Sequence, residues 1–144
     1  MGAQAYLELK KRHEEELNAF PIAYAFNEEQ LTEALEKLGA TKEECISLWN
    51  CGDILKRSDI PAFKEMLKRQ RVELREALKN EEFAEEAFLY EMDNHEYCIN
   101  WSGDDDVLDS LELTFDLVDE MGLRSAYLRA RKQHMKRAEE LGVI

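Results

Sequence analysis

The chain has 144 residues, of which 44% are hydrophobic and 9% aromatic, and its formal net charge is −13. Enough apolar side chains are present to form a core, which excludes an intrinsically disordered protein. No apolar run approaches the ~20 residues that a transmembrane helix needs. No basic segment followed by an apolar stretch marks a secretory signal. We therefore expect one cytoplasmic domain over residues 1–144, without membrane contact.

The first predicted elements are a helix, a strand and a second helix. The helix covers residues 3–20, and Pro21 ends it. Residues 22–26 form a short apolar run with β-favouring side chains, which predicts a strand. Asn27 is a suitable N-cap for the following helix, which ends at Gly39.

The middle of the chain predicts a short helix and then a second strand. A capping box at Thr41 opens the helix, which runs through about Leu48. Gly52 favours a turn, and residues 53–57 are the second strand candidate. The two strand candidates could pair as a ribbon, which needs helices on one face because two strands alone are marginally stable.

The remaining elements are helices separated by one clear loop. The predicted order is a helix from Ser58 to about Leu78, a helix from Asn80 to about Tyr97, a loop over 98–106, a helix after Val107, a short helix over 115–121 capped by Thr114, and a last helix over 123–141. The fold class is therefore mainly α, or α+β at most. We expect a single-domain bundle of about six helices with one short two-stranded ribbon, 22–26 with 53–57.

Charge is distributed unevenly along the chain. Residues 1–72 carry a net charge of −2, residues 73–123 carry −15, and residues 124–144 carry +4. A net negative surface repels phosphate backbones, so we expect no direct binding of nucleic acid. The acidic block and the basic last helix should instead attract each other, either within one chain or across a dimer.

The acidic block supplies the predicted interaction surface. A carboxylate-rich face can resemble a phosphate backbone and occupy the basic groove of another protein. The term acidic surface is used below for its eight predicted members, which are Glu81, Glu82, Glu85, Glu86, Asp104, Asp105, Asp106 and Asp109. The predicted partner is a protein with a basic surface.

One polar cluster has the residue types of a metal site. Glu91 and His95 share a helix face at a spacing of four residues, and Asp104, Asp105 and Asp106 follow. Carboxylates suit Mg²⁺ or Ca²⁺, and a histidine suits a transition metal. Neither HExxH nor an EF-hand loop is present, so we expect no bound metal or other cofactor. The structural alternative is a buried helix end at 94–97 that hydrogen-bonds its neighbours.

Other catalytic signals are weak. The chain contains no GxSxG, Walker or GxGxxG motif, and a His95–Cys98 pair would lack a visible oxyanion stabiliser. The three cysteines show no CxxC spacing and are expected to be reduced thiols. We expect His13 and His134 to be solvated. No catalytic residue is assigned, and the pattern favours a non-catalytic protein over an enzyme.

Four runs of sequence resemble a protein family. They are Asn18–Gln30, the helix end Leu35–Gly39, the turn Cys51–Asp59 and Phe88–Tyr97. The resemblance covers most of residues 5–128, and the family consists of small acidic proteins of unknown function from low-GC Gram-positive bacteria, their phages and mobile elements. Its members often have a Gly-rich turn where this chain has residues 49–52, which argues against a glycine-loop role here. The resemblance implies a biological setting, in these bacteria, their phages or mobile elements, but it implies no mechanism.

Three functions follow from these observations. The first is a non-catalytic interaction module, such as a phage or mobile-element accessory factor, that presents its acidic surface to a basic protein partner. The second is a small metal-dependent enzyme that uses Glu91, His95 and Asp104–Asp106. The third is a homodimeric structural protein. The lack of a catalytic signature favours the first and third, and we expect a monomer or weak homodimer.

Overall fold

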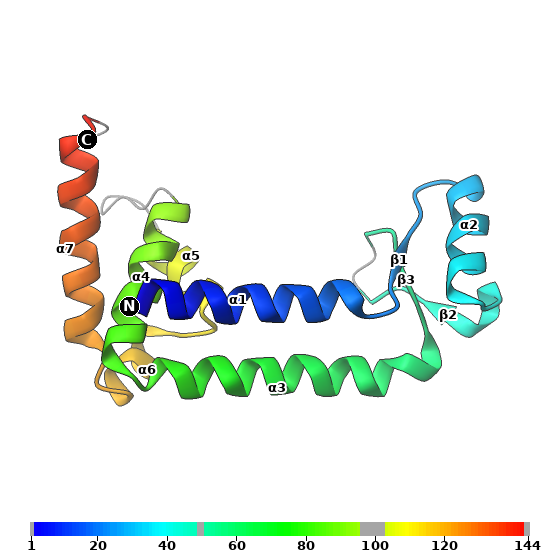
Figure 1. Ribbon diagram of the computed structural model, residues 1–144, viewed down its shortest axis with the longest axis horizontal. Helices are drawn as coiled ribbons and strands as arrows, with labels where there is room; N and C mark the ends of the chain where they lie inside the picture. Colours follow the sequence, from blue (N-terminus) through cyan, green and yellow to red (C-terminus); the bar gives the residue numbers. More distant parts are fainter. Residues whose placement is uncertain (1, 49–50, 96–102, 143–144) are drawn as a thin grey trace. The chain divides into compact units, whose positions relative to one another are not determined.

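A computed structural model describes residues 2–48, 51–95 and 103–142. Over these residues the chain is mainly α, as predicted (Figure 1). The seven α-helices there are α1 (Gly2–Ala19), α2 (Glu28–Leu38), α3 (Ile60–Leu78), α4 (Glu81–Asn94), α5 (Gly103–Ser110), α6 (Phe115–Glu120) and α7 (Arg124–Glu140). None of these helices is long and apolar enough to cross a membrane.

The chain divides into two compact units. Residues 12–70 form one, called the sheet unit below, and residues 1–11 with 71–144 form the other, called the helical unit. The sheet unit has 12 acidic and 8 basic side chains, a net charge of −4. The helical unit has 20 acidic and 11 basic side chains, a net charge of −9. That the whole chain is one domain stays a prediction.

The sheet unit contains a small antiparallel sheet of three strands. They are β1 (Ala23–Tyr24), β2 (Cys45–Ile46) and β3 (Asp53–Lys56), in the spatial order β1-β3-β2. The predicted pairing of 22–26 with 53–57 is confirmed, since Ala23 lies opposite Ile54 and Tyr24 opposite Asp53.

The third strand corrects the predicted helix over 41–48. Thr41 and Glu44 do form a capping box, but it opens only a 3-10 turn over Lys42–Glu44. Cys45 then pairs with Lys56 in the β2–β3 ladder, and this pairing buries the cysteine. Burial against a neighbouring strand outweighs the local helix signal, because a single capped turn is costly to nucleate.

The two faces of the sheet pack on different helices. Ala23 and Ile54 belong to a cluster with α2, which contributes Ala34 and Leu38. Leu55 points the other way, because side chains alternate along a strand. It packs with Phe63 and Met66 of α3 and with the partly buried Leu17 and Phe20.

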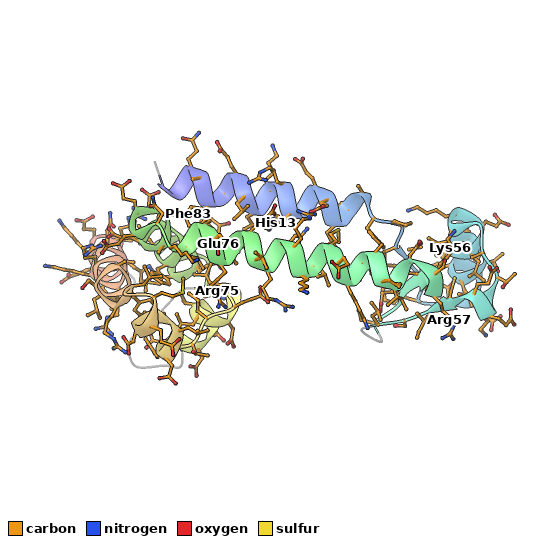
Figure 2. The ribbon with its side chains drawn as sticks, turned by 90° about the horizontal axis from the view of Figure 1, so that it is seen from below. His13, Lys56, Arg57, Arg75, Glu76 and Phe83 are labelled. Atoms are coloured by element: carbon orange, nitrogen blue, oxygen red, sulfur yellow. The ribbon has the colours of Figure 1, made fainter. Side chains whose placement is uncertain are left out.

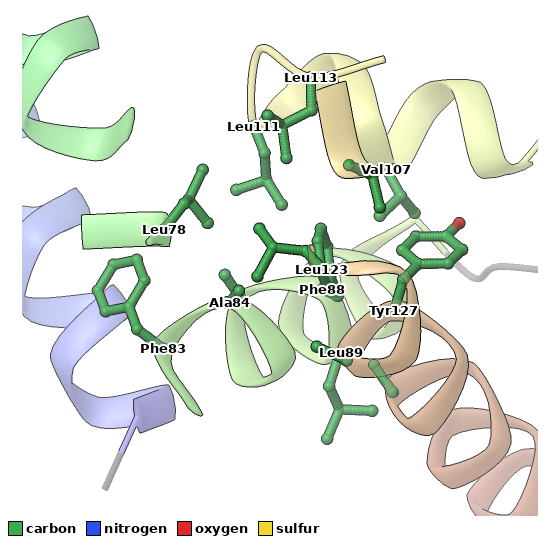
Figure 3. Packing of buried hydrophobic residues seen from close by; sticks show 14 of the residues in the cluster. Leu78, Phe83, Ala84, Phe88, Leu89, Val107, Leu111, Leu113, Leu123 and Tyr127 are labelled. Atoms are coloured by element: carbon green, nitrogen blue, oxygen red, sulfur yellow. The ribbon is translucent and has the colours of Figure 1, made fainter. Parts of the chain in front are cut away.

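The core of the helical unit is built around α4 (Figure 3). Tyr127 of α7 packs edge-on against Phe88 of α4, with ring centroids 5.0 Å apart, and against Phe115, at 5.6 Å. Besides Tyr127, the buried residues of α7 follow a spacing of four and include Ala126 and Ala130. Small side chains at this spacing let α7 lie close along α4.

Several predicted boundaries hold and others shift. Thr114 caps α6 by accepting from the Leu117 N–H at 3.2 Å, and Gly39 ends α2 with φ of 65°. The predicted loop over 98–106 is wrong from residue 103, where α5 begins; residues 98–102 lie outside the described residues. A 3-10 turn over Arg57–Asp59 precedes α3, in place of the predicted helix start at Ser58.

Candidate functional site

The candidate functional site lies on α4 and on the helices that contact it. Asn80 begins α4, because its side-chain oxygen accepts from the Phe83 N–H at 3.0 Å. Glu81 and Glu82 occupy the first turn, where carboxylates complement the helix dipole. The apolar face of α4 is buried, whereas Glu81 and Glu82 are exposed and Glu85 and Glu86 are partly exposed.

The four glutamates of the acidic surface on α4 line one hollow. This hollow has a volume of about 390 Å³, and Arg129 of α7 is its remaining lining residue. The Arg129 guanidinium donates from Nη2 to Glu81 at 2.9 Å and from Nε to Glu85 at 2.5 Å. These hydrogen bonds raise the pKa of Arg129 above its ordinary value. Two of the four glutamates are therefore paired with a cation of the same chain.

The aspartates of the acidic surface lie on α5. Asp104, Asp105 and Asp106 occupy its first turn, where they complement the helix dipole. Asp104 accepts a hydrogen bond from the hydroxyl of Tyr127, whose ring is buried. Asp105 and Asp109 are exposed and form no ion pair with any residue that the structure describes. Fewer than eight carboxylates of the acidic surface are therefore available to a partner, because Glu81, Glu85 and Asp104 form contacts within the unit.

A second contact joins the basic last helix to α4. Asp93 accepts from Nδ1 of His134 at 2.6 Å and from Nη1 of Arg137 at 2.8 Å. Only 7% of His134 is exposed, so the prediction that it is solvated is wrong. Together with the Arg129 pairs, this contact shows that the basic helix docks on the acidic helix of its own chain. His13 is also half-buried rather than fully solvated, and its carbonyl oxygen accepts from Gln70 at 3.2 Å.

Glu91 is the buried carboxylate of the site, with 1% of its surface exposed. Its Oε2 accepts from the Tyr6 hydroxyl and, at 3.1 Å, from the ammonium of Lys10, both on α1. Burial, and then the contact with Glu91, raises the pKa of Tyr6. The Lys10 ammonium also lies 5.3 Å from the ring centroid of Tyr90, a favourable cation–π distance. The carboxylate is thus compensated where it is buried, as a charge in an apolar interior must be.

His95 completes the surroundings of Glu91 without forming a catalytic triad. Its Nε2 lies 3.3 Å from Oε1 of Glu91 and 2.8 Å from Oγ of Ser110. The Ser110 hydroxyl donates to the carbonyl of Asp106 at 2.9 Å, and in the Nε2–H tautomer the His95 ring donates toward Glu91 and Ser110. In that tautomer Nε2 carries the proton and is not a general base for Ser110.

The predicted buried helix end at 94–97 is only partly correct. Asn94 and His95 are exposed residues, and 32% of the His95 side chain is accessible. Residues 96 and 97 lie outside the described residues. The predicted hydrogen bonding of His95 to its neighbours is present through Glu91 and Ser110.

The five metal candidates are not brought together. Glu91 and His95 are neighbours, while Asp104 is engaged with Tyr127. Within residues 2–48, 51–95 and 103–142, no group of three or more His, Cys, Asp or Glu side chains is placed to hold a metal ion. Among the cysteines, Cys45 is buried, which raises the pKa of its thiol, and Cys51 is exposed. Cys98 lies outside the described residues.

Comparison with models of known protein families identifies the family of this chain. Residues 5–133 match the model of DUF7659, a family of unknown function. The chain belongs to the DUF7659 family. This agrees with the resemblance to a family of unknown function over most of residues 5–128. No curated protein and no solved structure matches this DUF7659 chain.

The burial of two residues of the DUF7659 site, His134 and Glu91, was not predicted from the sequence, although signals for it were present. His134 continues the spacing of Ala126, Ala130 and Ala138, which is the buried stripe of α7. Glu91 likewise follows Ala84 and Ala87 on the buried face of α4. A polar residue inside such a stripe predicts a buried group with a partner, but not which partner.

Proposed function

We propose that this chain is a non-catalytic interaction protein that presents the acidic surface to a protein partner with a basic surface. The observation that carries the proposal is the hollow on α4, which is lined by four glutamates and by Arg129, the partner of Glu81 and Glu85. Two of its glutamates already bind a guanidinium, and Glu82 in its lining is exposed and has no ion pair among the described residues. A basic side chain of a partner would find the same carboxylate chemistry there.

The charge of the helical unit supports the same assignment. Its net charge of −9 remains after the basic last helix has been counted. Exposed Asp105 and Asp109 extend the negative field to α5. Such a field speeds encounters with basic proteins and disfavours acidic ones. It also disfavours direct contact with nucleic acid.

The arrangement around Glu91 and His95 supports a structural role for these residues. Tyr6, Lys10 and Ser110 occupy their polar atoms, and in the Nε2–H tautomer His95 donates toward serine. We therefore propose no reaction at this cluster. The setting in a phage or mobile element, and the cytoplasmic location, are part of the proposal and rest on the sequence.

A capture experiment tests the proposal. The full chain is immobilised, and the proteins that it retains are compared with those retained by a variant carrying Glu82→Gln, Asp105→Asn and Asp109→Asn. The matched control carries Glu14→Gln, Glu33→Gln and Glu36→Gln, which removes the same charge from exposed positions of the sheet unit.

The expected result is a basic protein that the wild type and the control retain and the first variant loses. Its binding should weaken as salt rises, because ions screen exposed charges over roughly 8–10 Å at physiological strength. Equal retention of the same proteins by both variants would refute a role for this surface.

A further inference from the structure

The sheet unit exposes two aromatic side chains next to its central strand. The exposed fractions are 55% for Tyr24 and 76% for Phe26, and Leu48 nearby is 36% exposed. Tyr24 lies opposite Asp53 in the β1–β3 ladder, and the Leu48 N–H donates to the Asp53 carboxylate at 2.8 Å. The three apolar side chains therefore gather around one end of β3. Apolar groups gathered on a surface in this way mark interaction sites more often than isolated ones do.

The backbone at Phe26 is held by hydrogen bonds, and its exposed ring lies against one neighbour. Its backbone N–H donates to the Gln30 side chain at 2.8 Å, and the preceding Ala25 N–H donates to the Gly52 carbonyl at 2.9 Å. The ring lies against Gly52, where an added Cβ would stand 2.5 Å from its Cε1 atom. Gly52 has φ of +86°, which glycine adopts without strain. An aromatic side chain on a backbone that is already ordered loses less entropy when it binds, which favours it as an interface anchor.

The charged residues that follow Phe26 at the start of α2 have one sign. Glu28 and Glu29 follow Phe26 in the exposed first turn of α2. The nearest cations along β3 are Lys56 and Arg57, labelled in Figure 2, which follow Asp53 by three and four residues. At ~3.3 Å per residue they lie roughly 10 Å or more along the strand from Asp53. A second copy of this chain would bring the same carboxylates against themselves.

We propose that Tyr24 and Phe26 form a docking surface for a protein partner, in which an apolar pocket rimmed by Lys or Arg takes the Phe26 ring. The proposal rests on the proposed function for the partner's basic character, and it adds a second contact surface in the sheet unit. Phe26 supplies the apolar anchor, and Glu28 and Glu29 pair with the cations at the rim. Such anchors carry most of an interface's binding energy, while rim charges contribute mainly to rate and specificity.

Crosslinking followed by titration tests this docking surface. The full chain with p-benzoylphenylalanine in place of Phe26 is irradiated in the cells that produce it, and the crosslinked protein is identified and purified. That protein is then titrated with the wild type, with Phe26→Ser, with the double variant Glu28→Gln and Glu29→Gln, and with Leu141→Ser. Leu141 is a matched control, because it is an apolar residue of the helical unit that is 78% exposed. Circular dichroism melting of each variant establishes that it is folded.

Phe26→Ser should weaken binding at least about 30-fold, as loss of an interface anchor does. The glutamine variant should weaken binding less and reduce its salt dependence, and Leu141→Ser should leave the affinity unchanged. An adduct with a second copy only, the absence of any adduct, or a change below threefold for Phe26→Ser would each overturn the proposal.

The variant that neutralises Glu82, Asp105 and Asp109 separates the two proposals. If it weakens binding and Phe26→Ser does not, the proposed function stands and this docking surface fails. If only Phe26→Ser weakens binding, the docking surface stands and the acidic surface of the helical unit is not the contact.

Discussion

Replacing Tyr6 with phenylalanine tests whether Glu91 is a buried charge that depends on its partners. The substitution removes one hydroxyl and keeps the ring, which packs edge-on against Phe83 with centroids 5.9 Å apart. Glu91 is 1% exposed, so water cannot fully replace the hydrogen-bond donor that is lost. A hydrogen bond to a charged group contributes about 1.5–3 kcal/mol, and we expect Tyr6→Phe to lower the free energy of unfolding by that amount.

The assay is urea unfolding followed by circular dichroism at pH 7. Tyr24→Phe is the matched control, because Tyr24 is 55% exposed and loss of its hydroxyl should change the free energy by less than about 0.5 kcal/mol. Combining Tyr6→Phe with Glu91→Gln should give a smaller loss than the two single losses added together, since both remove the same interaction. Strict additivity, or a Tyr6→Phe loss as small as the control's, would refute the reasoning.

The same substitution has a defined pH dependence. The pKa of Tyr6 is raised in the folded state above its ordinary value of 10.0, chiefly by burial. The folded protein therefore holds this proton more tightly than the unfolded chain does, and the contribution to stability is complete below pH ~10 and declines above it. The difference in unfolding free energy between wild type and Tyr6→Phe should be flat from pH 7 to about 9.5 and fall at higher pH. A difference that grows with alkaline pH would contradict this.

Three further substitutions test other contacts. Gly52→Ala places a Cβ against the Phe26 ring at a φ of +86°, and should lower the free energy of unfolding by about 1–3 kcal/mol, which a lower melting temperature would show. An unchanged melting curve would count against the close approach. Asp53→Ala removes a fully buried carboxylate that accepts from the Leu48 N–H, and should cost more than about 2 kcal/mol in chemical unfolding. His95→Ala removes a donor to a buried carboxylate and should cost about 1–3 kcal/mol, whereas an unaltered free energy of unfolding would exclude its structural role.

Local signals predicted most of the helices and one strand pair. The caps at Asn27 and Thr114 act within four residues, so the sequence alone contains the interaction that starts each helix. Strand β2 has only two residues, Cys45 and Ile46, and no periodicity can mark so short a strand. Its formation depends on the ladder with β3, which is a tertiary contact.

The candidate site was less predictable, because its decisive contacts are distant in the sequence. Tyr6 and Glu91 are 85 residues apart, and Arg129 reaches Glu81 across 48. The charge blocks predicted that basic and acidic helices attract each other, but not which carboxylates would be paired. The sequence therefore indicated the surface as a whole, and only the packing of α7 on α4 shows which members remain exposed.

The division of the chain into two units has a consequence for biosynthesis. The sheet unit is one continuous run, residues 12–70, whereas the helical unit needs both the first eleven residues and the segment after residue 70. A growing chain therefore completes the sheet unit first. At 5–20 residues per second, roughly 3–14 s pass before α7 has been synthesised. Until both α4 and α7 have been synthesised, the side chains of Tyr6 and Leu9 lack part of the core that covers them in the folded unit.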